Sequence, residues 1–269
     1  MSNREAKAAL ESGKIYVGDA PSADAARDVE AADVQIRPNA PRVRPWHDPV
    51  IVFRDQHLAV IAKPAGMLSV PAASRRGAAS IISNARRLLG EIHAVHRLDE
   101  GTSGLMLVAR TTACQEGLKQ LFFHHDVERR YVALAHGDFP AEPVRRESEL
   151  VRDRGDGLRG EGSDGKRAVS HFALRRAIRK GRSLIEATLE TGRTHQIRIH
   201  LEALGFPILG DRLYAPRPVA SAAARLALHA EVLGFRHPIT DESLRFEAPI
   251  ADDLARLVRE LGKKRATRR

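Results

Sequence analysis

Residues 96–109 read HRLDEGTSGLMLVA, a polar turn that runs directly into a continuous apolar segment. The glycines and hydroxyl residues around Asp99 favour a tight turn, in which backbone N–H groups and hydroxyls can hold the carboxylate. LMLVA has the composition of a buried strand. A carboxylate at the start of such a strand could be a nucleophile, a base or a metal ligand, or it could only shape the turn.

Strand-like and helix-like segments alternate irregularly on both sides of this turn, and hairpins are more evident than β-α-β units. We therefore expect an α+β fold with a mixed, mainly antiparallel sheet and flanking helices. Strands are predicted at residues 50–53, 58–62, 105–109, 131–135, 169–178 and 183–190. Helices are predicted at residues 78–89, stopped by Gly90, and after a capping box formed by Thr112 and Gln115.

The first 45 residues differ from the rest, because they are rich in Ala, Asp, Arg and Pro. They contain a possible helix, NREAKAALESG, and two possible short strands, KIYVGD and DVQIRP, before a proline-rich linker. We expect residues 1–45 to be a separate segment, 46–262 the main domain and 263–269 a basic tail. Within the main domain, the charged and Gly-rich residues 141–167 predict a long exposed excursion.

The charge balance points to a polyanionic partner. The chain carries 44 Lys and Arg against 34 Asp and Glu, a net charge of +10, which suits nucleic acid or an acidic membrane surface. No window is apolar enough to span a bilayer, and MSNREAKAALESG lacks the apolar stretch of a signal peptide. The single cysteine, Cys114, excludes an internal disulfide. We expect a cytoplasmic protein.

Two further groups compete for a functional interpretation. His93, His96 and Asp99 recur every third residue and could form a metal triad, but DEGTSG should break the helix that would align them. GRTHQIRIHLEALG predicts an amphipathic helix with a basic face, on which one arginine could point inward and keep a buried carboxylate ionised. Tyr131 begins a strand, where packing is the more common role, and the aromatic content of 4% disfavours a sheet of RNA-stacking rings.

Four segments in order resemble the motifs of the RluA family of pseudouridine synthases, from about Val50 to Pro249. HRLDEGTSGLMLVAR is similar to the family's signature loop and strand, and KPAGMLSVP to the loop that precedes it. ERRYVALAHG is similar to the tyrosine motif, and GRTHQIRIHLEALGFPILGDRLY to the third motif. RLALHAEVLGF and FEAPI resemble the closing segments.

The resemblance implies an isomerase that converts RNA uridine to pseudouridine without cofactor or metal. It implies that Asp99 attacks the target uridine, and that the uracil then leaves its ribose, turns and rejoins the ribose through carbon 5. Three paths stay open: addition of the carboxylate to the ribose, its addition to the base, and a glycal-like intermediate. Arg198 would pair with Asp99, Tyr131 would lie against the base and Arg97 would displace the nucleotide. Ile197, Lys63, Arg193 and His195 are the other expected substrate-binding residues.

The resemblance extends to the choice of RNA and to the first segment. LSVP, GFPILGDRLYA and RLALHAE look most like the branch that modifies both ribosomal and transfer RNA. Residues 3–19 and 33–38 resemble the later part of an alpha-L RNA-binding module whose first helix is absent here. We expect a monomer that acts on ribosomal RNA, transfer RNA or both. The alternative is a non-catalytic RNA-binding or ribosome-assembly protein that retains the fold.

Overall fold

A computed structural model describes residues 50–71 and 80–263, together with residues 9, 15–17, 20–21, 32 and 34–36. The chain divides into two units, residues 1–49 and 50–269. In the first unit, β1 (Ile15–Val17) pairs antiparallel with β2 (Ala20–Pro21) and β3 (Val34–Ile36), so both short strands expected here are present. Apart from Ala9, the expected helix lies outside the described residues, as do the linker at 37–49 and the tail from 264.

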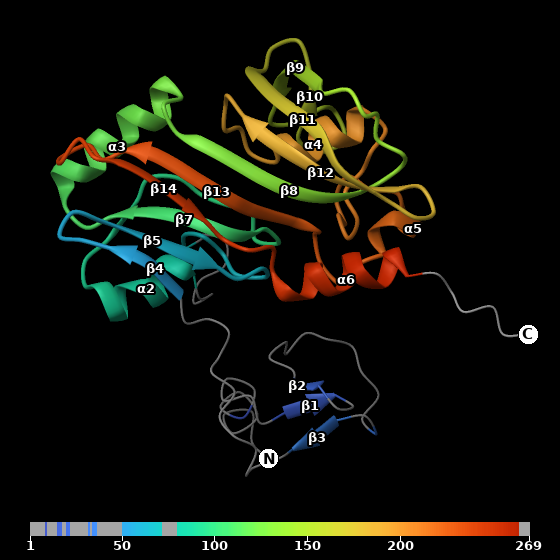
Figure 1. The fold of residues 1–269 in the computed structure, drawn as a ribbon, viewed down its shortest axis with the longest axis horizontal. Coiled ribbons are helices and arrows are strands. Elements are labelled where there is room, and N and C mark those ends of the chain that lie inside the picture. Colours follow the sequence, from blue (N-terminus) through green and yellow to red (C-terminus); the bar gives the residue numbers. More distant parts are fainter. Residues whose placement is uncertain are drawn as a thin grey trace, which may run out of the picture. The chain divides into compact units, whose positions relative to one another are not determined.

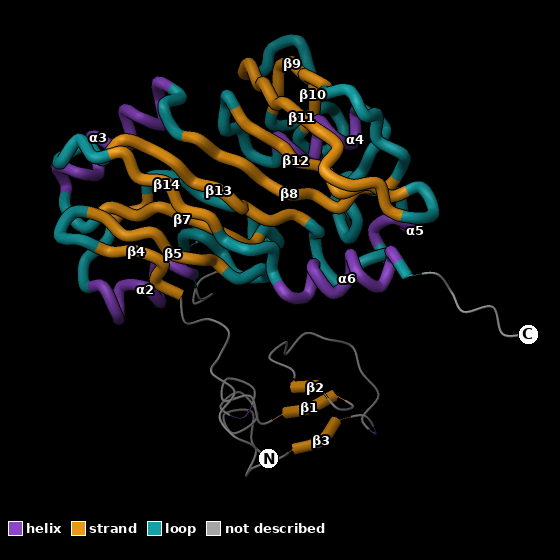
Figure 2. The backbone as a smooth tube through the Cα atoms, viewed as in Figure 1, coloured by secondary structure: helices purple, strands orange, loops and turns teal. Residues whose placement is uncertain are grey.

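The described part of the second unit contains one sheet of 11 strands (Figures 1 and 2). Its order is β10-β9-β11-β12-β8-β13-β7-β5-β4, with β14 paired to β13 and β6 to β7. The strands are β4 (Val50–Arg54), β5 (Leu58–Lys63), β6 (His93–Ala94), β7 (Ser103–Ala109), β8 (Glu128–His136), β9 (Val144–Val151), β10 (Gly160–Glu161), β11 (Lys166–Ile178), β12 (Arg182–Leu189), β13 (Leu228–Arg236) and β14 (Ser243–Glu247).

Among these neighbours only β13 and β7 run parallel, which confirms the expected mixed, mainly antiparallel sheet. Their pairing is short, joining His229 to Ser103 and Ala230 to Gly104. Gly104 has φ of +116°, and a Cβ there would lie 2.1 Å from the Ala230 carbonyl oxygen. Only glycine permits this approach, so the GTSG sequence sets the joint at which the two halves of the sheet meet.

Five helices accompany the sheet in the described residues: α2 (Ile81–Leu89), α3 (Thr112–His124), α4 (Gln196–Ala203), α5 (Arg217–Ala220) and α6 (Asp252–Gly262). Gly90 ends α2 as expected. The predicted cap of α3 is wrong by one residue, because Thr111 is extended and its hydroxyl accepts the Cys114 N–H at 3.3 Å. None of the described helices has the length and apolar character needed to cross a bilayer.

The central strands β5 and β7 are apolar over most of their length, at residues 58–62 and 104–109, because both of their faces are covered. Along β7, Met106 and Val108 belong to the core that includes α2, whereas Leu105 and Leu107 belong to the core that includes α3. Figure 1 shows α2 and α3 on opposite sides of this part of the sheet. Two-sided burial removes the alternation of polar and apolar residues that marks a half-exposed strand.

The expected excursion at residues 141–167 is wrong in part, since it contains β9 and β10. The burial of VRRESELV in β9 alternates, and its charged side chains pair across the strands, as in Arg146 with Glu161. Similarly, the basic face expected on α4 is not a solvent face, because Arg198 and His200 are both buried. Because their charged residues are paired or buried, the strand β9 and the buried face of α4 could not be recognised from amino-acid composition.

Burial of His200 generates a pH prediction. Its ring bonds with the hydroxyls of Ser170 at 2.9 Å and Ser148 at 3.1 Å, and burial lowers its pKa from 6.5 to about 4. Between these values the unfolded chain binds a proton that the folded chain rejects, so stability falls as pH drops from 6.5 to 4. We predict that His200→Asn reduces this slope by up to about 1.4 kcal/mol per pH unit in urea unfolding. Parallel profiles for the two proteins would contradict this.

Candidate active site

The turn that carries Asp99 is fixed through its backbone. The Thr102 N–H donates to the Asp99 carbonyl at 3.0 Å, and the Gly66 N–H donates to the Glu100 carbonyl at 2.8 Å. On the other side, the Ser69 hydroxyl accepts the Leu98 N–H at 2.9 Å and donates to the Leu98 carbonyl at 2.6 Å. The KPAGMLSVP loop and the Asp99 turn are therefore one bonded unit.

Lys63 supports this unit from within the protein. Its ammonium is 2% exposed and donates to the carbonyls of Pro64, Met67 and Glu100 at 2.9, 2.7 and 3.0 Å. Burial lowers the pKa of Lys63 to about 7, against the opposing charges of Asp99 and Glu100. Because its three N–H groups are used, Lys63 braces the turn and does not line the cavity, contrary to the expected substrate contact.

The Asp99 carboxylate faces Arg198 and His195. Arg198 Nη1 lies 3.3 Å from one oxygen and His195 Nε2 lies 3.8 Å from the other. The expected hydroxyl contacts do not form in the described structure, because the Ser103 hydroxyl bonds with His229 at 2.9 Å and the Thr102 hydroxyl has no partner there. The GTSG sequence thus orients the backbone, and a distant arginine orients the carboxylate.

Arg198 is itself held by Asp211, a residue to which the sequence analysis gave no role. Asp211 is 1% exposed and accepts Arg198 Nε at 2.8 Å and Nη2 at 2.7 Å, a two-point contact. It also accepts the Leu213 N–H at 3.0 Å. Burial opposes the charge on Arg198, but the Asp211 and Asp99 carboxylates raise its pKa above the ordinary value. The sequence feature that could have indicated a role for Asp211 is its place in GDRLY, within the third motif.

His195 and Tyr214 complete this side of the site. His195 adopts φ of +62° at the start of α4, and its Nδ1 lies 2.8 Å from the Tyr214 hydroxyl. The Tyr214 ring lies under the Arg198 guanidinium at 4.9 Å, a cation–π contact. Burial lowers the pKa of His195, partly opposed by Asp99, and so favours its neutral form.

These residues open onto a cavity of about 510 Å3, within the range typical of ligand sites. Tyr131 lies on β8 between β12 and β13, and burial raises the pKa of its hydroxyl, which keeps it protonated at neutral pH. The structure thus brings most of the expected residues together. Those that line the cavity are Arg97, Asp99, Tyr131, Arg193, His195, Ile197 and Arg198.

The alternative metal triad is not assembled. His96 Nε2 accepts the Leu107 N–H at 2.8 Å, and its ring stacks on Phe122 with centroids 4.7 Å apart. Across the described residues, no group of three or more His, Cys, Asp or Glu side chains is placed to hold a metal ion. His96 is instead a brace between β7 and α3.

Comparisons with known proteins identify the family and the fold. A family model described as RNA pseudouridylate synthase matches residues 57–203. The chain is 37% identical to an uncharacterized RNA pseudouridine synthase of Bacillus subtilis, covering 79% of this chain and 73% of the relative. It is 38% identical to a dual-specificity RNA pseudouridine synthase of Pasteurella multocida, covering 78% and 96%. The solved human RNA pseudouridylate synthase domain containing 1 has the same fold, with a TM-score of 0.65, 23% identity and coverage of 80% and 95%.

The unequal contacts of Arg198 generate a stability prediction. Asp211→Asn removes the carboxylate that makes the short contacts and leaves the buried guanidinium with Asp99 as its charged partner, so we expect a loss of about 3–5 kcal/mol in urea unfolding. Asp99→Asn removes a single contact from a more exposed carboxylate and should cost at most about 2 kcal/mol. Equal losses in the two variants would show that Asp211 does not hold Arg198.

Proposed function

The chain belongs to the RluA family of RNA pseudouridine synthases, and we propose that Asp99 is its nucleophile toward uridines in ribosomal RNA, transfer RNA or both. The observation that carries this proposal is the position of the Asp99 carboxylate. It opens onto a cavity of nucleotide size, on a turn fixed by Lys63 and beside the clamped guanidinium of Arg198. A fixed carboxylate needs little reorganisation to meet a bound substrate.

The isomerisation exchanges one bond for another without net gain or loss of atoms. The bond between N1 of uracil and C1′ of ribose breaks, and a bond between C5 and C1′ forms. The hydrogen of C5 is lost from carbon, and N1 gains one. The electron pair of the N1–C1′ bond leaves with the uracil, and an electron pair from C5 forms the new bond to C1′, so the Asp99 carboxylate is regenerated at the end of the reaction. The positive charge of Arg198 holds this carboxylate in line.

Tyr131 and Ile197 provide the walls between which the freed uracil would turn. Tyr131 is 9% exposed and Ile197 is 5% exposed, and both line the cavity. The aromatic ring can lie against the base, and the protonated hydroxyl can relay the C5 proton by passing on its own proton as it accepts that one. Arg193 and His195 line the same cavity, where they can contact the RNA backbone.

The finer assignments rest on the relatives and on charge. The relatives include the dual-specificity enzyme of Pasteurella multocida and a ribosomal large subunit pseudouridine synthase D of Zymomonas mobilis, 37% identical over 78% of this chain and 72% of that protein. We assign residues 46–262 to the synthase domain, 1–45 to an alpha-L-like segment and linker, and 263–269 to a basic tail that adds affinity for phosphates. The enzyme acts as a monomer in the cytoplasm.

The first test is loss of the nucleophile. Asp99→Asn preserves the size of the side chain but removes its charge, so pseudouridine formation should fall below detection while RNA affinity stays within about twofold, because affinity depends mainly on phosphate contacts. The measurement is tritium release from C5-labelled uridine in RNA from a strain lacking the gene. Wild-type turnover by Asp99→Asn would overturn the assignment.

The second test concerns Arg97, which is exposed and lines the cavity. If Arg97 displaces the target nucleotide, Arg97→Ala should lower turnover on folded RNA at least about tenfold, with a smaller effect on binding and on a short unpaired oligonucleotide. Equal losses on folded and unpaired RNA would contradict this role. Pseudouridine mapping of the gene-deleted strain identifies the folded substrate to use.

A further inference from the structure

Arg129 is a buried cation without a counter-charge in the active-site cavity. It lies two residues before Tyr131 on the same face of β8, is 6% exposed and lines the cavity. Its Nη2 donates to the Glu190 carbonyl at 2.9 Å, and its Nε has no partner in the part of the chain described by the structure. None of the described carboxylates forms an ion pair with it.

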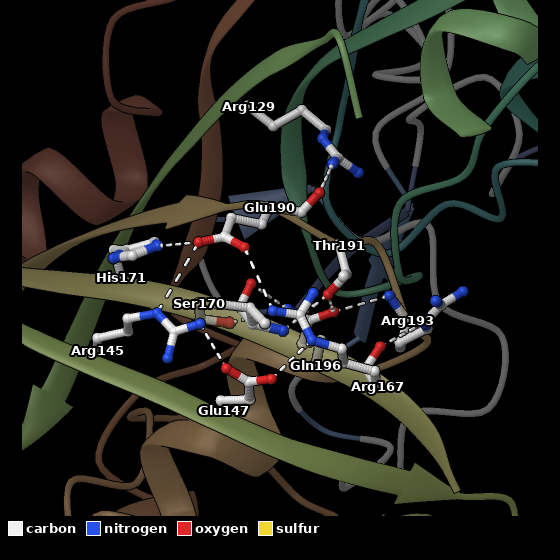
Figure 3. Close-up of polar contacts among 11 residues, drawn as sticks. Arg129, Arg145, Glu147, Arg167, Ser170, His171, Glu190, Thr191, Arg193 and Gln196 are labelled. Atoms are coloured by element: carbon white, nitrogen blue, oxygen red, sulfur yellow. Dashed lines mark hydrogen bonds and ion pairs between the residues drawn. The ribbon is translucent and has the colours of Figure 1, made fainter. Parts of the chain in front are cut away.

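The carboxylate of Glu190, whose carbonyl oxygen accepts from Arg129, contacts other residues. Figure 3 shows the Glu190 carboxylate directed toward His171 and Arg145, while Arg129 meets the backbone oxygen of Glu190. The carboxylate lies 2.6 Å from His171 Nε2, and 3.9 Å from both Arg145 and Arg167. Glu190 therefore neutralises the outer cations and leaves Arg129 unpaired.

Arg198 provides the comparison within the same cavity. It is as deeply buried as Arg129, at 7% exposed, but it contacts two carboxylates. Those carboxylates raise the pKa of Arg198, whereas burial lowers the pKa of Arg129. A buried guanidinium that lacks a counter-ion is costly to maintain, and the cost is recovered when an anion arrives.

The surroundings of Arg129 are shaped for such an anion. The guanidinium lies over the Phe122 ring at 5.7 Å, and a Cβ at position 192 would come within 2.5 Å of its Nη1, so a side chain there would displace the guanidinium from its present position. Arg193 lines the same cavity and has no ion pair among the described side chains. Burial, followed by the charges of Arg129 and Arg193, lowers the pKa of His125 at the same rim.

We propose that Arg129, in the cradle formed by Gly192 and Phe122, binds the RNA phosphate next to the target uridine. This rests on the proposed function, because it assigns Asp99 to the ribose and base and Arg129 to the backbone of the same nucleotide. The planar guanidinium offers paired N–H donors to a phosphodiester, the anion for which arginine is best suited. The phosphate supplies the negative charge that none of the described carboxylates gives to Arg129.

The test compares ligands that differ only by a phosphate. Uridine, uridine 3′-monophosphate and uridine 5′-monophosphate are titrated into the full-length protein and followed by NMR. The wild type should bind one of the monophosphates about tenfold more tightly than uridine, as expected for a charge-assisted contact. Arg129→Met should lose this preference while its affinity for uridine is unchanged. Arg130→Met, whose arginine lies near Glu186 and Glu247 instead, should keep it.

Two further variants test the proposal if Arg129→Met does not fold. Gly192→Ala keeps every charge but fills the cradle, and should reduce the preference; Arg129→Lys should retain part of it. A wild type without phosphate preference, or an Arg129→Met protein that keeps it, would overturn the proposal and leave Arg129 as a structural support for the Glu190 carbonyl. Turnover on RNA from the gene-deleted strain is measured separately, so failure of the proposed function leaves the phosphate preference visible.

Discussion

The site depends on one guanidinium shared unequally between two carboxylates. Arg198 gives two short hydrogen bonds to Asp211 and a longer one to Asp99. Asp211 is buried and also caps backbone N–H groups, so it fixes the arginine, whereas Asp99 faces the cavity and keeps one side open to substrate. This division lets a buried charge orient a reactive carboxylate without neutralising its exposed side.

The sheet brings these groups together from distant parts of the sequence. Asp99 precedes β7, Arg198 lies on α4, and Tyr131 lies on β8, which is separated from β7 only by β13. The short parallel contact of β7 with β13 requires Gly104, so the same GTSG sequence that follows Asp99 also makes the joint between the two halves of the sheet. Fold and site therefore share one structural requirement.

The mixed sheet could be predicted from local hairpin patterns, and most of the expected site residues line the cavity because ordered local motifs carry them. Their bonds could not be predicted, because they connect residues far apart in sequence: Lys63 reaches Glu100, and Arg198 reaches Asp99. The role of Asp211 was not predicted, because a carboxylate after glycine resembles an ordinary turn residue. Strand β9 was not predicted, because paired Arg and Glu side chains give a half-buried strand the composition of a loop. Composition records which charges are present, and only the fold determines how they are paired.

In this mechanism Asp211 acts through Arg198 on the reaction of Asp99. The direct measurement is the single-turnover rate of pseudouridine formation by Asp211→Asn at saturating RNA from a strain lacking the gene, in conditions where the variant is fully folded. We predict that the rate of Asp211→Asn lies at least about tenfold below that of the wild type while its RNA affinity is unchanged, because the Asp99 nucleophile is present but misaligned. A wild-type rate in the folded variant would contradict it.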